Sequence, residues 1–398
     1  MTGLVARTRR LDGEADLLGW AGDDGAVWLR DGDGLAGRGV AARVDVAVAA
    51  AWLASVETDD EVGRPGSGAV ALGALPFGGG GDLVVPAQLV GRSADGTSWV
   101  TAISEGGAVD PLAIDAAARG VVAPAPSHFE VTPTVDPDRW MKCVDNARER
   151  ILDGELTKVV LAREVVITAD SPIPPSLVLS RLQRAYPSCM LYSIDGFVGA
   201  SPELLVARSG DRVRAQPMAG TAPRSGDPSA DARLAASLLA SEKDRWEHQI
   251  TIDMVHDTLL GWCSYLDAEA EPSVVSVANV QHLATAVTGR LSWPEPSVLE
   301  LVAALHPTPA VGGEPRAAAL DLIGRLEPDD RGRYGGPVGW VDGGGNGSWA
   351  VGIRSAELDG ATARVFAGVG VVSDSDPDAE LAETRAKFQA VLNAIVRP

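Results

Sequence analysis

The sequence predicts an α+β fold in which large, mostly antiparallel sheets form the body of the molecule. Two observations predict it: β-branched runs are separated by turns short enough for hairpins, and segments with helical apolar spacing lie between these runs. The chain has 398 residues, of which 45% are apolar, so it can bury a large core. We expect one integrated structural domain, with an N-terminal part over 1–125 and a larger region over 126–398.

The chain is strongly acidic. Its 54 Asp and Glu residues against 34 Lys and Arg residues give a formal net charge of −20. A field of this sign repels nucleic acid and anionic membrane surfaces, so neither is an expected partner. An anionic ligand would have to be held by local cations or by a metal ion.

The cysteines and the apolar runs favour a cytoplasmic protein. Cys143, Cys189 and Cys263 are far apart, odd in number and form no CxxC pair, which disfavours both a disulfide framework and a thiolate zinc site. The most apolar run is interrupted by Arg43 and Asp45 and is poorly suited to spanning a bilayer. No apolar core of signal-peptide length is present near the first residues. We therefore expect a reducing, cytoplasmic location.

The N-terminal part is expected to contain short strands. Runs over 68–75 and 82–90 have strand-like composition, and glycine clusters separate them. The glycines within 77–83 predict a flexible turn rather than a phosphate cradle, because no helix signal follows them. A proline-rich passage over 121–137 then connects this part to the remainder.

Helices and strands are mixed in the second region. A helix is predicted to begin after Asp136, with Pro137 in its first turn, and to end before Gly154. Apolar residues recur through it at helical spacing, namely Trp140, Val144, Ala147 and Ile151. Further strands are predicted over 157–168, 189–201 and 203–218, with an amphipathic helix over 175–187.

A charged helix is predicted over 233–260. Glu247 shares a face with Ile250 and Met254, and Asp244 lies one turn before it. This register places a carboxylate on the apolar stripe, where isolated carboxylates are almost never fully buried. Taken alone, the helix is explained most simply by a glutamate at the edge of the stripe.

The C-terminal helix has a similar acidic face. Asp376 and Pro377 mark its start, and Glu380, Glu383 and Lys387 follow on one face. A solvated face with ion pairs is the simple interpretation. If the two acidic helices face one another, however, their carboxylate oxygens would suit a hard ion such as Mg²⁺. The five histidines do not show the H-E-x-x-H spacing of a zinc site.

Other residues could belong to a site for a small anion. Gly368 and Gly370 form a local G-x-G that lacks the third glycine of a dinucleotide loop, although such glycines can expose backbone N–H groups to a carboxylate. Arg354 is expected in mid-strand, either as a surface ion-pair residue or as a carboxylate clamp. His306 precedes a proline turn, where a packing or capping role is equally compatible with the sequence.

Nine motifs occur in order between residue 140 and the C-terminus: KVVLAR, FVGASPELL, MAGTAPR, LLASEKDRWEH, LHPTPAVGGEP, RGRYGGPVGW, VGIRSA, FAGVGVVS and SDPDAELAETRAK. Together they resemble the chorismate-utilising enzymes, and most closely the isochorismate synthases. The N-terminal ALGALPF is a weaker match. The resemblance implies one large α/β sandwich with helices outside and two subdomains around a central cleft.

The resemblance also implies a role for each matched position. Glu247 and Glu383 match Mg²⁺ ligands, and Asp244 and Glu380 match the supporting acidic positions. The positions that match the lining of a chorismate pocket are Gly220, Thr221, His306, Tyr334, Arg354, Gly368, Gly370 and Lys387. The cations among them would offset the two carboxylates of chorismate.

Two further matches imply the reaction. Lys158 occupies the position of a general base that activates water, where anthranilate and aminodeoxychorismate synthases usually have glutamine. Glu203 matches the general acid that protonates the departing 4-hydroxyl group. Ala219 stands where aminodeoxychorismate synthases have a nucleophilic lysine, so covalent lysine chemistry is disfavoured. The implied reaction adds water at C2 of chorismate and releases the C4 hydroxyl as water, giving isochorismate.

Three alternatives remain open on the sequence. Salicylate synthase shares nearly all these residues but also eliminates pyruvate, and the turn HPTPAVGG favours an enzyme that stops at isochorismate. Anthranilate synthase component I would need an amidotransferase partner or ammonia, and a non-catalytic relative would be a binding protein. We expect a monomer without an amidotransferase subunit, whose product feeds menaquinone or siderophore biosynthesis.

Overall fold

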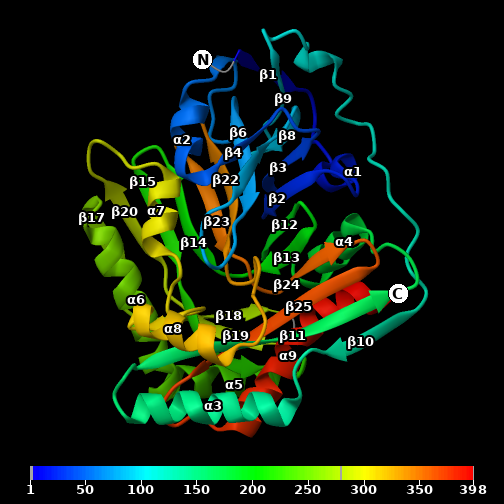
Figure 1. Ribbon diagram of the computed structural model, residues 1–398. Helices are drawn as coiled ribbons and strands as arrows, with labels where there is room; N and C mark the ends of the chain where they lie inside the picture. The colour runs from blue at the N-terminus through cyan, green and yellow to red at the C-terminus, as the bar shows by residue number, and fades with distance from the viewer. Residues whose placement is uncertain (1–2, 278–279, 398) are drawn as a thin grey trace.

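Two large sheets form the body of the protein in the computed structural model, which describes residues 3–277 and 280–397 (Figure 1). The larger sheet has thirteen strands. Twelve follow the order β10 (Phe129–Pro133), β11 (Lys158–Ala169), β25 (Thr362–Val371), β24 (Ser355–Asp359), β13 (Phe197–Ser201), β12 (Met190–Ile194), β2 (Ala26–Arg30), β3 (Asp33–Arg38), β8 (Gln88–Arg92), β9 (Ser98–Glu105), β1 (Leu4–Leu11) and β5 (Glu57–Asp60). The thirteenth, β21 (Gly313–Glu314), pairs with β11.

The second sheet has nine strands, and a third has three. The nine follow the order β17 (Cys263–Ala268), β20 (Val287–Leu291), β15 (Arg212–Gln216), β14 (Leu204–Ser209), β23 (Gly347–Val351), β22 (Pro337–Asp342), β6 (Val70–Ala74), β7 (Asp82–Val85) and β4 (Ala42–Asp45). The three are β16 (Met218–Pro223), β19 (Val280–Ala284) and β18 (Ser273–Val277). Among the described strand pairs, β1 with β5 is the one parallel pair, which confirms the predicted antiparallel character.

The helices lie around these sheets (Figure 1). They are α1 (Leu17–Ala21), α2 (Val46–Ala54), α3 (Pro137–Leu152), α4 (Pro175–Ala185), α5 (Pro228–Ala240), α6 (Glu242–Leu260), α7 (Val298–Leu305), α8 (Arg316–Leu326) and α9 (Pro377–Val396), with a short 3₁₀ turn over Pro111–Ala113. No helix within 3–277 or 280–397 combines the length and the apolar composition that a membrane span requires.

The first hundred residues contribute strands to both large sheets. β2 pairs with β12, and β6 pairs with β22, so the N-terminal strands continue both sheets from their middle out to one edge, which is β5 in the larger sheet and β4 in the nine-stranded one. Between the sheets, a core of large side chains includes Trp28, Leu72, Tyr192 and Trp340. The two parts of the chain therefore share one core.

Helices α3 and α8 pack against the paired antiparallel strands β11 and β25 in the lower part of the molecule (Figure 1). Trp140 and Val144 of α3 and Leu322 of α8 join buried residues of β11 and β25 in one cluster. The apolar spacing of α3 and its Asp136 cap are as predicted, because the Asp136 carboxylate accepts hydrogen bonds from the Asp138 and Arg139 amides.

The helix predicted over 233–260 is two helices. Ser241 has an extended backbone (φ −71°, ψ 114°) and its hydroxyl accepts a hydrogen bond from the Asp244 amide, so it ends α5 and caps α6. The apolar and charged pattern runs through this break without a glycine or proline, which is why the sequence did not reveal it. The break places Asp244 in the first turn of α6.

Candidate active site

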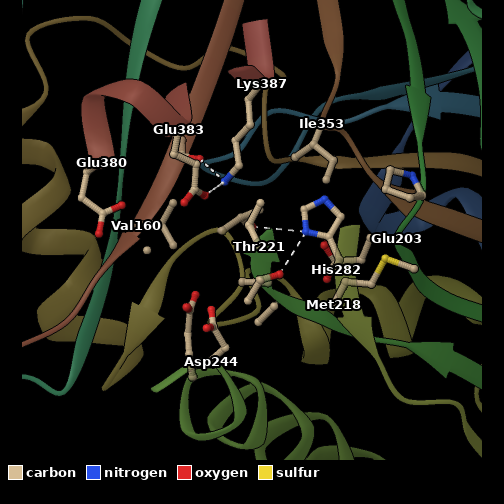
Figure 2. Close-up of a pocket in the computed structure, with 18 of the residues that line it drawn as sticks. Val160, Glu203, Met218, Thr221, Asp244, His282, Ile353, Glu380, Glu383 and Lys387 are labelled. Atoms are coloured by element: carbon tan, nitrogen blue, oxygen red, sulfur yellow. Dashed lines mark hydrogen bonds and ion pairs between the residues drawn. The ribbon is translucent and has the colours of Figure 1, made fainter. Parts of the chain in front are cut away.

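A cavity of about 260 Å³ lies between the paired strands β11 and β25, the N-terminal halves of α6 and α9, and strands β16 and β19 (Figure 2). Its wall combines acidic, cationic and glycine residues from parts of the chain more than 200 residues apart. The polar side chains that line it are Glu203, Thr221, Lys243, Asp244, Glu247, His282, Tyr334, Arg354, Glu380, Glu383 and Lys387.

The two acidic helices do face the same space. Asp244 and Glu247 of α6 and Glu380 and Glu383 of α9 all line the cavity. Figure 2 shows the carboxylates of Glu380 and Glu383 entering from one side and that of Asp244 from the other. The simple interpretations, an edge glutamate and a solvated helix face, are therefore insufficient, because these side chains converge.

Three of the four carboxylates have a lysine partner. Glu247 Oε1 lies 2.9 Å from Lys158 Nζ, Glu383 Oε1 lies 2.6 Å from Lys387 Nζ, and Glu380 Oε1 lies 3.9 Å from Lys243 Nζ. Each lysine partly neutralises a charge that the cavity would otherwise hold unpaired. Without such partners, four carboxylates around a small space would repel one another strongly.

The carboxylates still favour an additional cation. Burial, followed by the negative charge of Glu383, raises the pKa of Glu380 to about 7, and burial raises that of Asp244 above its ordinary value. Hard oxygen donors of this kind suit Mg²⁺. Among the described residues no three His, Cys, Asp or Glu side chains are grouped closely enough to hold an ion as they stand. The donor set thus fits Mg²⁺ in chemistry, although its members are not closed into one ligand shell.

Lys158 lies at the start of β11, fully buried beneath the cavity wall. The wall is thin here because β25 contributes Gly370, whose position pairs with Val160. A Cβ atom at Gly370 would lie 2.5 Å from Glu247 Oε1 and 3.0 Å from Lys158 Cε. The glycine is therefore required by the close approach of the Lys158–Glu247 pair to the strand.

Glu203 is the other predicted catalytic residue, and it lies in the cavity wall next to β14. Its side chain is almost fully buried, and this desolvation raises its pKa to about 8. A hydrogen bond from the Met218 backbone and the charges of Lys158 and Arg354 oppose the shift but do not cancel it. Glu203 is consequently protonated at neutral pH and able to donate a proton.

Arg354 also lines the cavity. It was predicted in mid-strand, but it does not lie in a strand. It lies in the link between β23 and β24 with φ of +52°, a left-handed conformation that is rare for a residue other than glycine. Its Nη2 donates to His282 Nε2 at 3.0 Å. Its Nε is buried and has no hydrogen-bond partner within the described part of the chain. An unsatisfied guanidinium donor beside a cavity favours an anionic ligand.

His282 and Lys243 line the cavity although the sequence did not single them out. The His282 Nδ1 lies 3.1 Å from the Gly220 carbonyl, which fixes Nδ1 as the donor and leaves Nε2 to accept from Arg354. Burial and the charge of Arg354 lower the pKa of His282 to about 3, so the ring is neutral. A lone histidine in a strand-like run carries no spacing signal that could have identified it.

The remaining pocket positions are brought together with one exception. Gly220, Thr221, Tyr334, Gly368 and Lys387 all line the cavity. Gly220 has φ of +70° at the register shift of β16 against β19, a conformation that suits glycine. The Lys387 ammonium donates to the Gly368 carbonyl at 2.8 Å, which ties α9 to β25. Gly368 and Gly370 lie within β25 rather than in a loop.

His306 is the exception, because it does not line the cavity. Its Nε2 lies 2.8 Å from the Phe77 carbonyl, and its ring meets the Phe77 ring edge to face at 5.7 Å. Burial lowers its pKa to about 4, so it is a neutral donor to that carbonyl. The proline turn that follows His306 contributes Ala310 and Val311 to the cavity wall instead.

A buried ion pair holds this wall against β11. Arg331, 3% exposed, bonds Glu327 Oε2 through Nε at 2.7 Å. The same guanidinium donates to the carbonyls of Val311 at 2.8 Å and Val160 at 2.7 Å, and Glu327 accepts from the Ala162 amide. One arginine thus links the turn and the strand that border the cavity.

Replacing Arg331 by leucine is expected to lower the free energy of unfolding by about 3 kcal/mol, because it leaves the Glu327 carboxylate buried without its partner. Urea denaturation followed by circular dichroism measures the change. The control is Arg325→Leu, which removes an exposed i,i+4 pair with Asp321 and is expected to cost less than about 0.5 kcal/mol. Equal effects of the two replacements would contradict the assignment.

Comparisons with known proteins identify one family of enzymes. Residues 111–396 match the family described as chorismate binding enzyme. The chain is 42% identical over 352 residues to a Mycobacterium tuberculosis protein provisionally named isochorismate synthase MenF, covering 83% of this chain and 88% of the relative. It is 40% identical over 278 residues to isochorismate synthase DhbC of Bacillus subtilis, covering 67% of this chain and 70% of the relative.

Solved structures share the fold. A crystal structure from Bacillus anthracis, provisionally named the 2,3-dihydroxybenzoate-specific isochorismate synthase DhbC, superposes with a TM-score of 0.78 at 34% identity, covering 94% of this chain and 96% of that one. MenF, the menaquinone-specific isochorismate synthase of Escherichia coli, superposes with a TM-score of 0.82 at 24% identity, covering 99% and 95%. The predicted α+β architecture is confirmed by both.

Proposed function

The chain belongs to the family of chorismate binding enzymes, and from this premise we propose that it is an isochorismate synthase that converts chorismate to isochorismate. The observation that carries the proposal is Glu203, a buried carboxyl group that is protonated at neutral pH in a cavity lined by Arg354, whose Nε has no hydrogen-bond partner among the described residues. Such a group can protonate a leaving hydroxyl, which is what this isomerisation requires. The product would supply menaquinone or siderophore biosynthesis.

The substrate is a dianion, and the cavity offers two cations for it. The Nε of Arg354 has no partner in the part of the chain that the structure describes, and the orientation of the side chain is fixed by the hydrogen bond to His282. Lys387 lies on α9 across the cavity, held by Glu383 and the Gly368 carbonyl. Two cations on opposite walls would orient a ring that bears two carboxylates and limit its movement.

The acid and the base act on opposite ends of the allylic system. Lys158, once it has released the ammonium proton of its ion pair with Glu247, accepts a proton from water while the water oxygen bonds to C2 of chorismate. The ring double bond shifts, and the C4–O bond breaks as Glu203 donates its proton to the departing oxygen. One water is added and one is released, so atoms and charge balance, and the protonated leaving group avoids the expulsion of hydroxide.

Mg²⁺ is the proposed cofactor. Glu247 and Glu383 would hold it, with Asp244 and Glu380 in support, and the bound ion would neutralise and orient a substrate carboxylate. The raised pKa of the buried Glu380 beside Glu383 supports this choice, since an added cation would relieve their repulsion.

Replacing Glu383 by glutamine is expected to raise the Mg²⁺ concentration for half-maximal activity at least about tenfold, because a neutral amide is a weaker donor to a hard cation. A metal titration of initial rates measures it. Asp378→Asn, an exposed acid in the first turn of the same helix, serves as the control and should leave the titration unchanged. An unaltered Mg²⁺ requirement in Glu383→Gln would remove Glu383 from the ligand set.

The reaction itself is tested by incubating the purified protein with chorismate, with and without Mg²⁺, and identifying products by chromatography and proton NMR. A metal-dependent mixture of chorismate and isochorismate is the expected result. Salicylate and pyruvate as main products would make the protein a salicylate synthase, which the shared residues leave as the second candidate. Unchanged chorismate would overturn the proposal.

A further inference from the structure

A loop from the N-terminal part of the chain reaches the outer side of the wall of the catalytic cavity. Residues 75–81 form this loop, which connects β6 to β7 in the nine-stranded sheet. Among the described residues, none before Val160 lines the cavity. Phe77 in the loop nevertheless contacts the two segments that form this part of the wall, one over 306–311 and the other over 331–335.

The backbone of Phe77 joins these two segments. Its amide donates to the Gly332 carbonyl at 2.8 Å, and its carbonyl accepts a hydrogen bond from His306 Nε2 at 2.8 Å. Four exposed glycines, over 78–81, follow directly. Because glycines have no side chains that could hold a loop in place, the contacts of Phe77 tie this loop to the cavity wall.

The Phe77 ring fills the space behind the wall. The Arg331 guanidinium carbon lies 4.4 Å from the ring centroid, and the His306 ring meets the Phe77 ring edge to face. A Cβ atom at Gly335 would lie 3.2 Å from Phe77 Cδ2 and 3.6 Å from Val311 Cβ. The ring also packs against two hydrophobic clusters, one that contains Val311 and one that contains buried residues of β11 and β25. One aromatic side chain thus joins a cation, an imidazole and two clusters.

Arg331 connects this ring to the lining of the cavity. Its guanidinium donates to the carbonyls of Val311 and Val160, and its own carbonyl accepts a hydrogen bond from the Tyr334 amide at 3.0 Å. Val160, Val311 and Tyr334 all line the cavity. Val160 follows Lys158 by two residues on β11, so the two side chains lie on the same face of the strand. A displaced guanidinium would therefore move three parts of the lining.

We infer that Phe77 is a positioning residue, which holds the Val311 and Tyr334 side of the cavity at the spacing that a bound chorismate ring requires. Phe77 does not line the cavity, so it acts through Arg331 and His306. Displacement of positioning groups by about 1 Å can cost about 10²-fold in rate, even where the replaced residue is far from the chemistry. We take the substrate from the proposed function, on which this role of Phe77 rests.

Calorimetric titration of the full chain with chorismate, without Mg²⁺, tests this role. Phe77→Leu keeps both backbone hydrogen bonds and an apolar side chain, but it removes the ring face under Arg331 and the ring contact with His306. Chorismate is expected to bind at least about fivefold more weakly to this variant, because the displaced wall no longer fits the ring. In steady-state assays with Mg²⁺, KM should rise by a similar factor.

Phe129→Leu is the matched control. Phe129 of β10 is also partly buried, and it packs against a cluster that shares no residue with the cavity lining. This variant should bind chorismate as the wild type does. Thermal unfolding of both variants separates positioning from stability, because a purely structural role of Phe77 would lower Tm and leave the affinity of the folded protein unchanged.

A double-mutant cycle with Val311→Ala tests whether the effect passes through the wall. Phe77→Leu should weaken chorismate binding by a smaller factor in the Val311→Ala background than in the wild type, because part of the wall that Phe77 holds is already removed. Additive effects would overturn the inference. Equal chorismate affinity of folded Phe77→Leu and the wild type would also overturn it, as would a wild type that does not bind chorismate.

Product analysis keeps this test distinct from that of the proposed function. A wild type that binds chorismate but forms no isochorismate would remove the proposed reaction. The comparison of Phe77→Leu with Phe129→Leu would still decide the role of Phe77, because it measures binding and not turnover.

Discussion

Replacing Lys158 by methionine is expected to lower kcat for chorismate by about 10³- to 10⁴-fold, at the upper end of what one general base contributes. Methionine fills nearly the same volume as the lysine stem. The packing around this fully buried position is therefore kept, while the amine of Lys158 is lost. Water then has no base to take its proton as it bonds to C2. KM should change by less than about threefold, because Lys158 lies beneath the wall and not on the substrate's carboxylates.

Steady-state rates on the purified variant measure this effect. Lys142→Met, an exposed lysine of α3, is the matched control and should retain wild-type kcat. Loss of the Lys158–Glu247 ion pair also lowers stability, so thermal unfolding is recorded to confirm that the variant is folded at the assay temperature. A folded Lys158→Met protein with more than about a tenth of wild-type kcat would show that another group is the base.

Replacing Glu203 by glutamine is expected to lower kcat by about 10³-fold, because the amide keeps the shape of the carboxyl group but cannot protonate the departing oxygen. Glu130→Gln, at an exposed position of β10, is the control and should leave kcat unchanged. Chorismate binding, measured in the absence of Mg²⁺, should be retained within about threefold. Wild-type turnover by a folded Glu203→Gln protein would rule out Glu203 as the acid.

The pH dependence of the wild type gives a second test of Glu203. Burial raises its pKa to about 8, and only the protonated form is active as an acid. The rate should therefore fall tenfold per pH unit above about pH 8, and this limb should be absent from the residual activity of Glu203→Gln.

The same shift predicts an effect on stability. Between pH 4.5, the ordinary pKa of the group, and about pH 8 the folded state retains a proton that the unfolded state has lost. The wild type should therefore lose stability relative to Glu203→Gln as the pH rises through this window, and the difference should become constant above it.

Helical spacing predicted the acidic half of the site. Asp244 and Glu247, like Glu380 and Glu383, are one turn apart, and this local geometry survives in α6 and α9. That the two helices meet at one cavity is a property of tertiary packing, and only the family resemblance indicated it. Strand β11 was also predicted, from its β-branched density, whereas its partner β25 was not.

The residues whose location the sequence did not predict are held by contacts between distant segments of the chain. Arg354 adopts a left-handed conformation inside an apolar alternation that is typical of a strand. His306 is held by Phe77, which lies 229 residues away along the chain. His282 acquires its place only because β19 pairs with β16 and brings its ring to Gly220 and Arg354. No periodicity encodes partners of this kind.

The pairing of β2 with β12 and of β6 with β22 limits how the gene can be dissected. The match to the family description covers residues 111–396, yet a fragment from residue 111 onward would lose one end of both large sheets, from β2 to the edge strand β5 in one and from β6 to the edge strand β4 in the other. Its β12 and β22 would become open edges, and the apolar faces once covered by the missing strands would be exposed. Because an open strand edge can pair with another chain, the fragment is expected to aggregate. Expression, domain fusion and directed evolution should therefore treat the segment from β1 to β9, residues 4–105, as part of the catalytic folding unit, and libraries that vary these strands should be expected to alter turnover.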